Sequence, residues 1–168
     1  MKVITWVNLE GVYIVTSPAY NDGMRPIGET DEECLERVWA RLVAVGGYGI
    51  PIDHPHHYID DSVQEAKLVE CCGRHFRDAW EMDTDGTPKV NMPKARGIQM
   101  GSIRKVRNKE LSALDITFMR AVEDEDTDAQ STIKAKKQEL RDIPQTFDLT
   151  TDTADELKEK WPEGLPKE

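Results

Sequence analysis

The chain lacks the sequence features that mark membrane, secreted and disulfide-rich proteins. None of its apolar stretches approaches the ~18 residues that a membrane-spanning helix needs, and its start has neither the hydrophobic run nor the cleavage site of a signal peptide. Its three cysteines, Cys34, Cys71 and Cys72, are odd in number and two are adjacent, which argues against a disulfide framework. We therefore expect free thiols, synthesis in a cytoplasm and no membrane partner.

Motifs of enzymes are also absent. The sequence has no phosphate-binding glycine-rich loop, no dinucleotide fingerprint, no Gly-x-Ser-x-Gly elbow and no His-Glu-x-x-His pair. It therefore predicts a protein that is not an enzyme and holds no cofactor. A nucleophilic pair of Cys71 or Cys72 with a histidine stays open, because such partners meet in space and not in sequence.

Positive charge is scarce in the first half of the chain. Residues 1–90 hold 8 Lys and Arg against 16 Asp and Glu, and residues 91–168 hold 14 against 16, which gives net charges of −8 and −2 in a total of −10. Such a balance argues against nucleic-acid binding, which depends on clustered cations. The local exception is a group of four cations that would spread around a helix and form no single patch: Arg104, Lys105, Arg107 and Lys109.

The first part of the chain, residues 1–90, is predicted to be a small α+β domain with two β-hairpins and one helix. Residues 3–7 and 12–15 are rich in β-branched and aromatic side chains and are separated by a turn-forming insert with Gly11. Thr30 and Glu33 form a capping box that starts a helix to about Ala44, ended by two glycines. The expected buried face of this helix is Cys34, Leu35, Val38, Leu42 and Val45.

The second predicted hairpin pairs residues 76–82 with 88–92 across a turn that contains Asp83, Asp85 and Gly86. Alternating aspartates also begin calcium-binding EF-hand loops. The sixth position of such a loop is Pro88 here and the twelfth is Lys94, where the calcium loop requires Gly and Glu. The sequence therefore predicts a turn and no calcium site.

All four histidines lie near the adjacent cysteines, and these side chains are the ligands that zinc prefers. The spacing matches no established zinc pattern, because the chain has no Cys-x-x-Cys. Two hypotheses stay open: a structural metal site, or a polar loop followed by partly buried cysteines. The candidate ligands are His54, His56, His57, Cys71, Cys72 and His75.

The second part, residues 91–168, is predicted to be a long αα-hairpin followed by a short terminal helix and a tail. Apolar residues recur at three and four positions along residues 92–123 and again along 127–143. Asp126 or Thr127 is expected to cap the second helix, and Pro144 is expected to end it. On the first helix the predicted buried stripe is Met100, Ile103, Leu111, Leu114, Phe118 and Ala121.

Trp161 and Leu165 are candidate anchors on another protein, since aromatic residues bury a large area at low entropic cost. The alternative is that Trp161 covers the helical hairpin of its own chain. The fold class that these patterns predict is α+β: a small antiparallel β portion with one helix, then the long C-terminal αα-hairpin and a short terminal helix.

Several segments resemble small proteins encoded near the tail genes of tailed bacteriophages. They lie within residues 76–162 and include Phe76–Glu81, Val90–Arg96 and Leu140–Pro144. The last of these and the closing Trp161-Pro162 are similar to the C-terminal part of tail fibre assembly proteins. The resemblance implies a non-enzymatic phage tail protein, made in the host cytoplasm and located in the virion tail.

By this resemblance the partner is a tail fibre or baseplate protein, and the chain is either an accessory subunit that stays in the virion or an assembly chaperone. A homo-oligomer within the tail is also open. The expected partner contacts are Arg104, Arg107, Trp161 and Leu165. The competing hypothesis is a metal-binding or host-directed phage protein that uses the region from His54 to His75.

Overall fold

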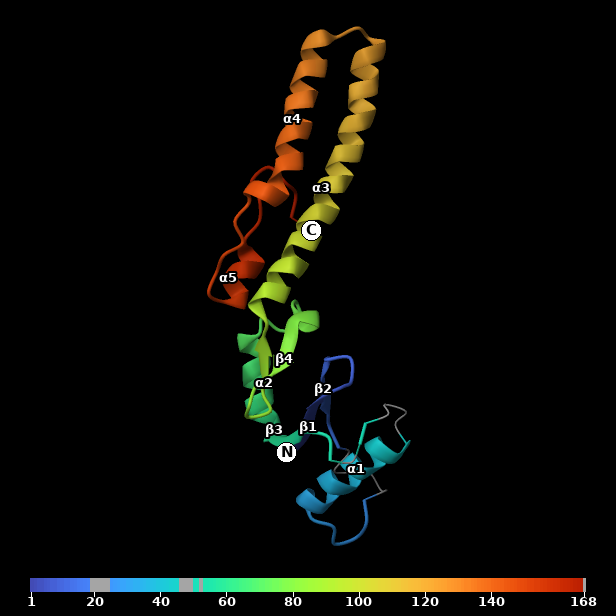
Figure 1. Ribbon diagram of the computed structural model, residues 1–168, viewed down its shortest axis with the longest axis vertical. Helices are drawn as coiled ribbons and strands as arrows, with labels where there is room; N and C mark the ends of the chain where they lie inside the picture. Colours follow the sequence, from blue (N-terminus) through green and yellow to red (C-terminus); the bar gives the residue numbers. More distant parts are fainter. Residues whose placement is uncertain (19–24, 46–49, 52, 168) are drawn as a thin grey trace. The chain divides into compact units, whose positions relative to one another are not determined.

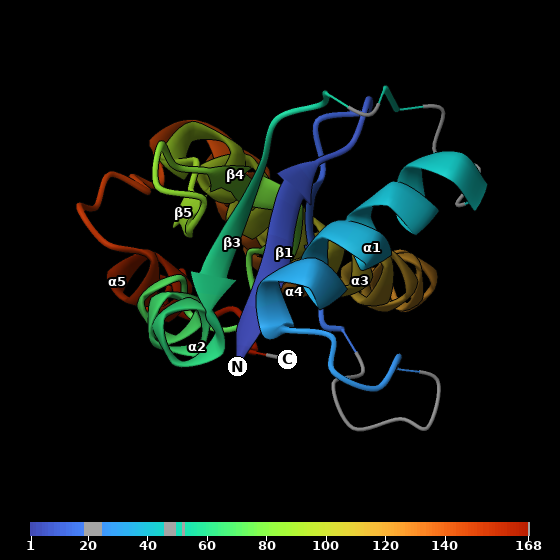
Figure 2. The ribbon, with the colours of Figure 1, turned by 90° about the horizontal axis from the view of Figure 1, so that it is seen from below.

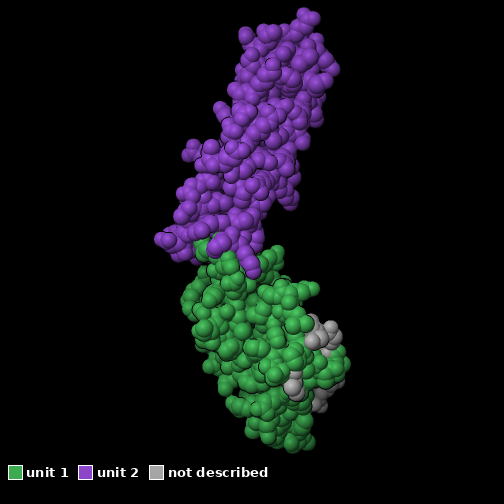
Figure 3. Space-filling model, in the orientation of Figure 1, with its two compact units in different colours: residues 1–92 green, residues 93–168 purple. Residues whose placement is uncertain are grey.

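The computed structural model describes residues 1–18, 25–45, 50–51 and 53–167. The chain divides into two compact units, residues 1–92 (unit 1) and 93–168 (unit 2), which Figure 3 shows in green and purple. Unit 1 contains the described strands, and unit 2 contains two long helices that pack together and a short terminal helix (Figure 1). The predicted α+β class is confirmed.

The main sheet of unit 1 has three antiparallel strands in the order β2-β1-β3. They are β1 (Lys2–Val7), β2 (Tyr13–Thr16) and β3 (His56–Asp60), and Figure 2 shows β1 and β3 running in opposite directions. The predicted first hairpin is confirmed. In its turn the Asn8 side chain accepts hydrogen bonds from the backbone N–H groups of Glu10 and Val12 at 3.0 and 2.8 Å.

Strand β3 is a finding that the sequence did not predict, because its first residues were interpreted as part of a polar loop. Its side chains gain partners from elsewhere in the chain. The ring of His56 stacks on Trp39 with a centroid distance of 4.1 Å, and Thr5 pairs with His57 across the sheet. Tertiary packing therefore overrides the polar local sequence.

One face of the sheet is covered by helix α1 (Asp31–Val45). Alternate residues of β1 point to this face, and Trp6 meets Trp39 edge to face at 5.8 Å. The predicted capping box is confirmed: Thr30 N–H donates to Glu33 Oε2 at 2.8 Å, and Glu33 N–H donates to Thr30 Oγ1 at 3.3 Å.

The predicted buried face of α1 is only partly correct. Cys34 and Leu35 are buried, and Val38 and Leu42 are half-buried against the same cluster. Val45 is 75% exposed, so its place on the buried face is wrong: it lies in the last turn, and the helix is anchored through Trp39. The two glycines that were expected to end the helix lie outside the described residues.

The opposite face of the sheet meets a second hairpin, β4 (Trp80–Met82) with β5 (Pro88–Val90). This hairpin was predicted, although its strands are shorter than expected. Its turn requires glycine twice over: Gly86 has a φ of +84°, and a Cβ there would collide with His57. The Gly86 carbonyl accepts hydrogen bonds from Thr5 Oγ1 at 2.7 Å and from Tyr13 Oη at 3.1 Å.

Between β3 and β4 the chain forms helix α2 (Asp61–Glu70) and the short 3-10 helix η1 (Arg77–Ala79). The prediction of one helix in this part missed α2. The apolar residues of α2 do not mark its buried side: the buried residue is the polar Gln64, whereas Val63 and Val69 are exposed. Amphipathic patterning therefore gave no signal.

Unit 2 is built on α3 (Met92–Glu123) and α4 (Thr127–Thr146), which run side by side in opposite directions (Figure 1). Asp126 caps α4 by accepting a hydrogen bond from Ala129 N–H at 2.9 Å, as predicted. The prediction that Pro144 ends α4 is wrong. Pro144 lies inside the last turn, and Phe147 N–H still reaches Ile143 O at 2.9 Å.

We call the buried residues on the facing sides of these helices the interhelical seam: Ile103, Val106, Ala121, Ile133 and Leu140. Ile103 and Ala121 belong to the predicted stripe of α3. The other four residues of that stripe, Met100, Leu111, Leu114 and Phe118, are half-buried. The seam is therefore narrow, as expected for two helices that pack along a single stripe.

The chain after α4 folds back on the first half of α3 and includes α5 (Ala154–Glu159) (Figure 1). Gln99 is 2% exposed, and its Nε2 donates to the carbonyls of Lys160 at 2.9 Å and Lys158 at 3.4 Å. Arg96 Nη2 donates to Thr151 O at 3.1 Å. The bonds from Gln99 satisfy carbonyls at the end of α5 that have no partner within the helix, and the bond from Arg96 holds the segment before α5.

Candidate partner-binding surface

The distal half of α3 carries apolar side chains that face away from the seam. Ile116 is 59% exposed, Met119 is 58% exposed and Val122 is 44% exposed. Residues three apart are neighbours on a helix surface, so these three form a row, which we call the apolar ridge. Within the described residues, the side chains of this row are far more exposed than those of the seam. The row is therefore available to another polypeptide.

A hollow of about 320 Å³ lies between α3 and α4, and we call it the basic groove. Phe118 forms its apolar part, and Lys134 and Lys137 lie over the ring with Nζ atoms 5.5 and 5.4 Å from its centroid. Lys137 also forms an ion pair with Asp115. The remaining lining residues are Gln138 and Arg141. The groove therefore combines an aromatic ring with an excess of positive charge.

The two arginines predicted to contact a partner lie on α3 outside this area. Arg104 is exposed. Arg107 is half-buried, and its Nε and Nη2 donate to the side chain of Asn108 at 3.3 and 2.9 Å. The structure does not bring these arginines together with Trp161 and Leu165 through any hydrogen bond that it describes.

The tail residues lie within unit 2. Leu165 is 5% exposed, and Trp161 is half-buried with its Nε1 donating to Leu165 O at 2.9 Å. Lys160 Nζ donates to the carbonyls of Asp148 and Thr150 at 3.1 and 3.0 Å. The geometry favours the alternative that Trp161 covers its own chain, and a partner could contact little of Leu165.

The histidines and cysteines of the proposed metal site are dispersed. Among the described residues, no group of three or more His, Cys, Asp or Glu side chains could hold a metal ion. His54 Nε2 bonds with Val7 O at 2.6 Å, and His56 bonds with His54 O at 2.9 Å and with the Tyr58 hydroxyl at 3.2 Å. His56 and His57 are consecutive strand residues, so their side chains leave the sheet on opposite faces.

The cysteines are buried, as the alternative hypothesis expected, but the segment before them is a strand and a helix and not a polar loop. Cys71 Sγ lies 3.5 Å from Pro88 O. Burial raises the pKa of Cys71 to about 11, so the thiol stays protonated at neutral pH. A protonated, buried thiol is a poor nucleophile and a poor metal ligand.

Comparison with known families connects unit 2 with phage tails. Residues 100–163 match the family model described as Phage tail assembly chaperone protein. The matched range contains the apolar ridge, the basic groove and α5. The comparisons with curated proteins and with solved structures found no match. In the part of the chain that the structure describes, no helix is both long and apolar enough to cross a membrane.

The family match supports a phage tail-associated protein with a non-enzymatic role in tail assembly. The apolar ridge was missed by sequence reasoning, although a signal was present: Ile116 and Met119 are apolar residues that fall off the predicted stripe of α3. On a surface helix such positions are normally polar.

Proposed function

We propose that the chain binds a tail fibre or baseplate protein through the apolar ridge and the basic groove of unit 2, as an assembly chaperone or an accessory subunit. The observation that carries this proposal is the coincidence of the matched range, residues 100–163, with the helices that bear both features. The described residues of unit 2 offer surface for contact, and the role that we propose for them is non-enzymatic.

The chemistry of the surface specifies the kind of segment that it would bind. Ile116, Met119 and Val122 would bury apolar side chains of the partner, at a gain of about 25 cal/mol per Å² of apolar area. Lys134 and Arg141 beside Phe118 favour carboxylates over cations. The expected partner segment is therefore apolar with flanking acidic residues.

Exposed apolar surface is also what an assembly chaperone needs for its task. A tail protein that has not yet assembled exposes apolar surface that would otherwise aggregate. A helical hairpin can cover such surface without rearranging, because the seam and the hydrogen bond from Gln130 Nε2 to Ala121 O at 3.1 Å already hold α3 against α4.

The test is capture of the fibre or baseplate protein of the same phage by the full chain on co-expression. The variant Ile116→Ser/Met119→Ser removes two of the three ridge residues, and we expect it to reduce capture roughly thirtyfold or more, since interface anchors contribute about 2 kcal/mol or more. Serine and isoleucine have similar helix propensities, so α3 is expected to persist.

The matched control is Val45→Ser/Val69→Ser, which removes two exposed apolar residues from helices of unit 1, 75% and 74% exposed. Capture equal to that of the wild type is expected for this control. Undiminished capture by the ridge variant would contradict the proposal, and so would equal losses for both variants.

Retention in the virion separates the two forms of the proposal. Mass spectrometry of purified virions is expected to find an accessory subunit in stoichiometric amounts and to find no chaperone that leaves after assembly. If the chain is absent from virions, the fibre protein must be more soluble with it than without it. Equal solubility would exclude the chaperone role.

A further inference from the structure

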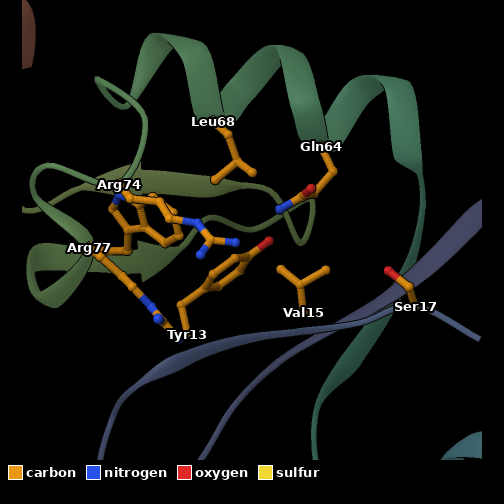
Figure 4. Close-up of a pocket in the computed structure, with 8 residues that line it drawn as sticks. Tyr13, Val15, Ser17, Gln64, Leu68, Arg74 and Arg77 are labelled. Carbon is orange, nitrogen blue, oxygen red and sulfur yellow. The ribbon is translucent and has the colours of Figure 1, made fainter.

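We propose that a cavity in unit 1 binds the carboxylate or phosphate group of a small, partly apolar ligand. The site goes beyond the function proposed for unit 2, since it uses none of the residues of the helical hairpin formed by α3 and α4. The cavity has a volume of about 300 Å³ and lies between β2, α2 and the segment that leads into β4 (Figure 4). Its lining is Tyr13, Val15, Ser17, Gln64, Leu68, Arg74, Arg77 and Trp80.

The walls of the cavity are firmly packed. Tyr13 and Trp80 belong to one buried cluster, with their rings edge to face at a centroid distance of 6.3 Å. Val15 and Leu68 pack against the same cluster. The apolar part of the site is therefore preformed, which lowers the entropic cost of binding.

Among the described residues, every charged residue of the lining is an arginine. Arg74 and Arg77 are exposed at the cavity, and within the described residues neither guanidinium group has a hydrogen bond or an ion pair. Figure 4 shows the Arg74 guanidinium extending into the space between Leu68 and Tyr13. Residues 1–90 contain 16 Asp and Glu but only 8 Lys and Arg. Two neighbouring arginines with no carboxylate partner among the described residues are therefore unusual there.

Buried donors in the lining also lack acceptors. Gln64 is 4% exposed, and its Nε2 has no hydrogen bond of normal geometry although the amide lies beside the Tyr13 hydroxyl (Figure 4). Trp80 Nε1 is likewise buried without an acceptor. A buried polar group left unpaired costs about 1–3 kcal/mol, so an anion oxygen within reach of either donor would recover part of this cost.

The Tyr13 hydroxyl adds no negative charge to the site. It donates to Gly86 O at 3.1 Å, and burial raises the pKa of Tyr13 to about 12, so it remains neutral in the physiological range. Among the described residues of the lining, Ser17 adds a second hydroxyl and none carries a carboxylate.

An unusual turn positions the two arginines. Cys72 and Gly73 have consecutive left-handed φ values of 58° and 56°, and Gly73 N–H closes the end of α2 by donating to Leu68 O at 2.8 Å. Cys72 is 9% exposed, so the turn is held by burial of its side chain. The chain then turns into η1, and Arg74 and Arg77 both reach the cavity.

Charge and size define the ligand. Guanidinium groups bind carboxylate and phosphate oxygens through paired, charge-assisted hydrogen bonds. The volume lies at the small end of the range for ligand sites, which leaves room for one anionic group on a small apolar body. Benzoate and phenyl phosphate have this chemistry, and benzamide has the shape of benzoate without its charge.

The test follows the indole N–H resonance of Trp80 in the NMR spectrum of the full chain, identified with the variant Trp80→Phe. At constant ionic strength we expect saturable shifts with benzoate or phenyl phosphate at a Kd on the order of 1 mM, and none with benzamide. Binding of phenyl phosphate alone would assign the site to phosphates, and binding of benzoate alone would assign it to carboxylates.

The variant Arg74→Gln/Arg77→Gln is expected to weaken binding roughly tenfold or more, because a hydrogen bond to a charged group contributes about 1.5 kcal/mol or more. Arg74→Lys/Arg77→Lys keeps the charge and should restore part of the affinity. Arg41→Gln, an exposed arginine of α1, is the control and should bind as the wild type does. No saturable shift with either anion, equal shifts with benzamide, or unchanged affinity in the Gln variant would each overturn the proposal.

Discussion

The two units bury different kinds of side chain. Among the described residues, every buried aromatic ring lies in unit 1: Trp6, Tyr13, Trp39, Phe76 and Trp80. Unit 2 buries aliphatic residues such as Ile103, Leu140 and Leu157, while its aromatic residues Phe118, Phe147 and Trp161 are half-buried. Unit 1 therefore relies on large rings packed against both faces of a sheet, and unit 2 relies on a narrow stripe between helices.

This difference suggests a division of labour. In unit 1 both faces of the sheet are packed, so their apolar side chains are buried within the unit. Two helices that meet along one stripe leave their outer faces free, and in α3 that face carries Ile116 and Met119. A hairpin is thus suited to contact a partner, and a small packed domain is suited to hold a cavity of fixed shape.

The largest expected effect is that of Trp6→Ala, which removes a ring with 0% exposure from the centre of unit 1. Truncation of a buried aromatic residue costs about 3–5 kcal/mol. We expect unit 1 to lose most of its stability while α3 and α4 keep their helical signal, measured by urea unfolding followed by near- and far-ultraviolet circular dichroism. Leu9→Ala, at a residue 67% exposed, is the control. Joint loss of both signals would show that the units do not fold separately.

A smaller effect is expected for Leu140→Ala in the interhelical seam, where the side chain is 8% exposed. Truncation of a buried leucine costs about 2–5 kcal/mol of stability. The seam is narrow and has solvent on both sides, so the cost should lie at the lower end of this range. Hydrogen exchange of the α4 amides should accelerate while unit 1 is unaffected. Glu139→Ala, on the exposed neighbour, should leave exchange unchanged. Unaltered α4 exchange in the Leu140 variant would contradict the role of the seam.

Each unit also has a helix cap, which allows a matched pair of substitutions. Thr30→Ala removes the capping box of α1, and Asp126→Ala removes the hydrogen bond to Ala129 N–H. Both should lower the free energy of unfolding of their own unit by about 1 kcal/mol. A loss in the opposite unit, seen as a shift of the other urea transition, would break the comparison.

The two units are also expected to differ in their response to alkaline pH. Burial raises the pKa of Cys71 from 9.0 to about 11 and that of Tyr13 from 10.0 to about 12. Between these limits the unfolded chain loses protons before the folded chain does, so the stability of unit 1 is greatest below pH 9 and falls as the pH rises. Every cysteine and tyrosine lies in residues 1–92, so unit 2 lacks this response.

Urea midpoints at pH 8 and pH 10 measure the difference. The midpoint of unit 1 should decrease, and in the variant Cys71→Ala the decrease should be smaller. A midpoint of unit 1 that rises with pH would have the wrong sign for buried neutral acids.

The sequence predicted correctly those features in which residues close together along the chain form hydrogen bonds with each other. The Thr30 and Glu33 box, the Asp126 cap and both hairpins depend on residues a few positions apart. Strand β3 could not be predicted in this way, because His56 is held by Trp39 from α1 and by the pairing with β1.

The same distinction explains the sites. Arg74 and Arg77 look like ordinary surface residues until the fold brings Tyr13 and Gln64 to them. The histidines suggested a metal because they are close in sequence, but strand alternation separates His56 from His57. The ridge residue Ile116 was readable as an apolar position off the stripe, and only the structure shows that it is uncovered.

The central claim is that the outer surface of the helical hairpin holds the tail protein. Hydrogen exchange of the full chain, free and in complex with the captured fibre or baseplate protein, tests it most directly. We predict slower exchange in α3 from Leu111 to Glu123 and in the first three-quarters of α4, with little change in unit 1. Protection confined to unit 1, with α3 and α4 unchanged, would contradict the claim.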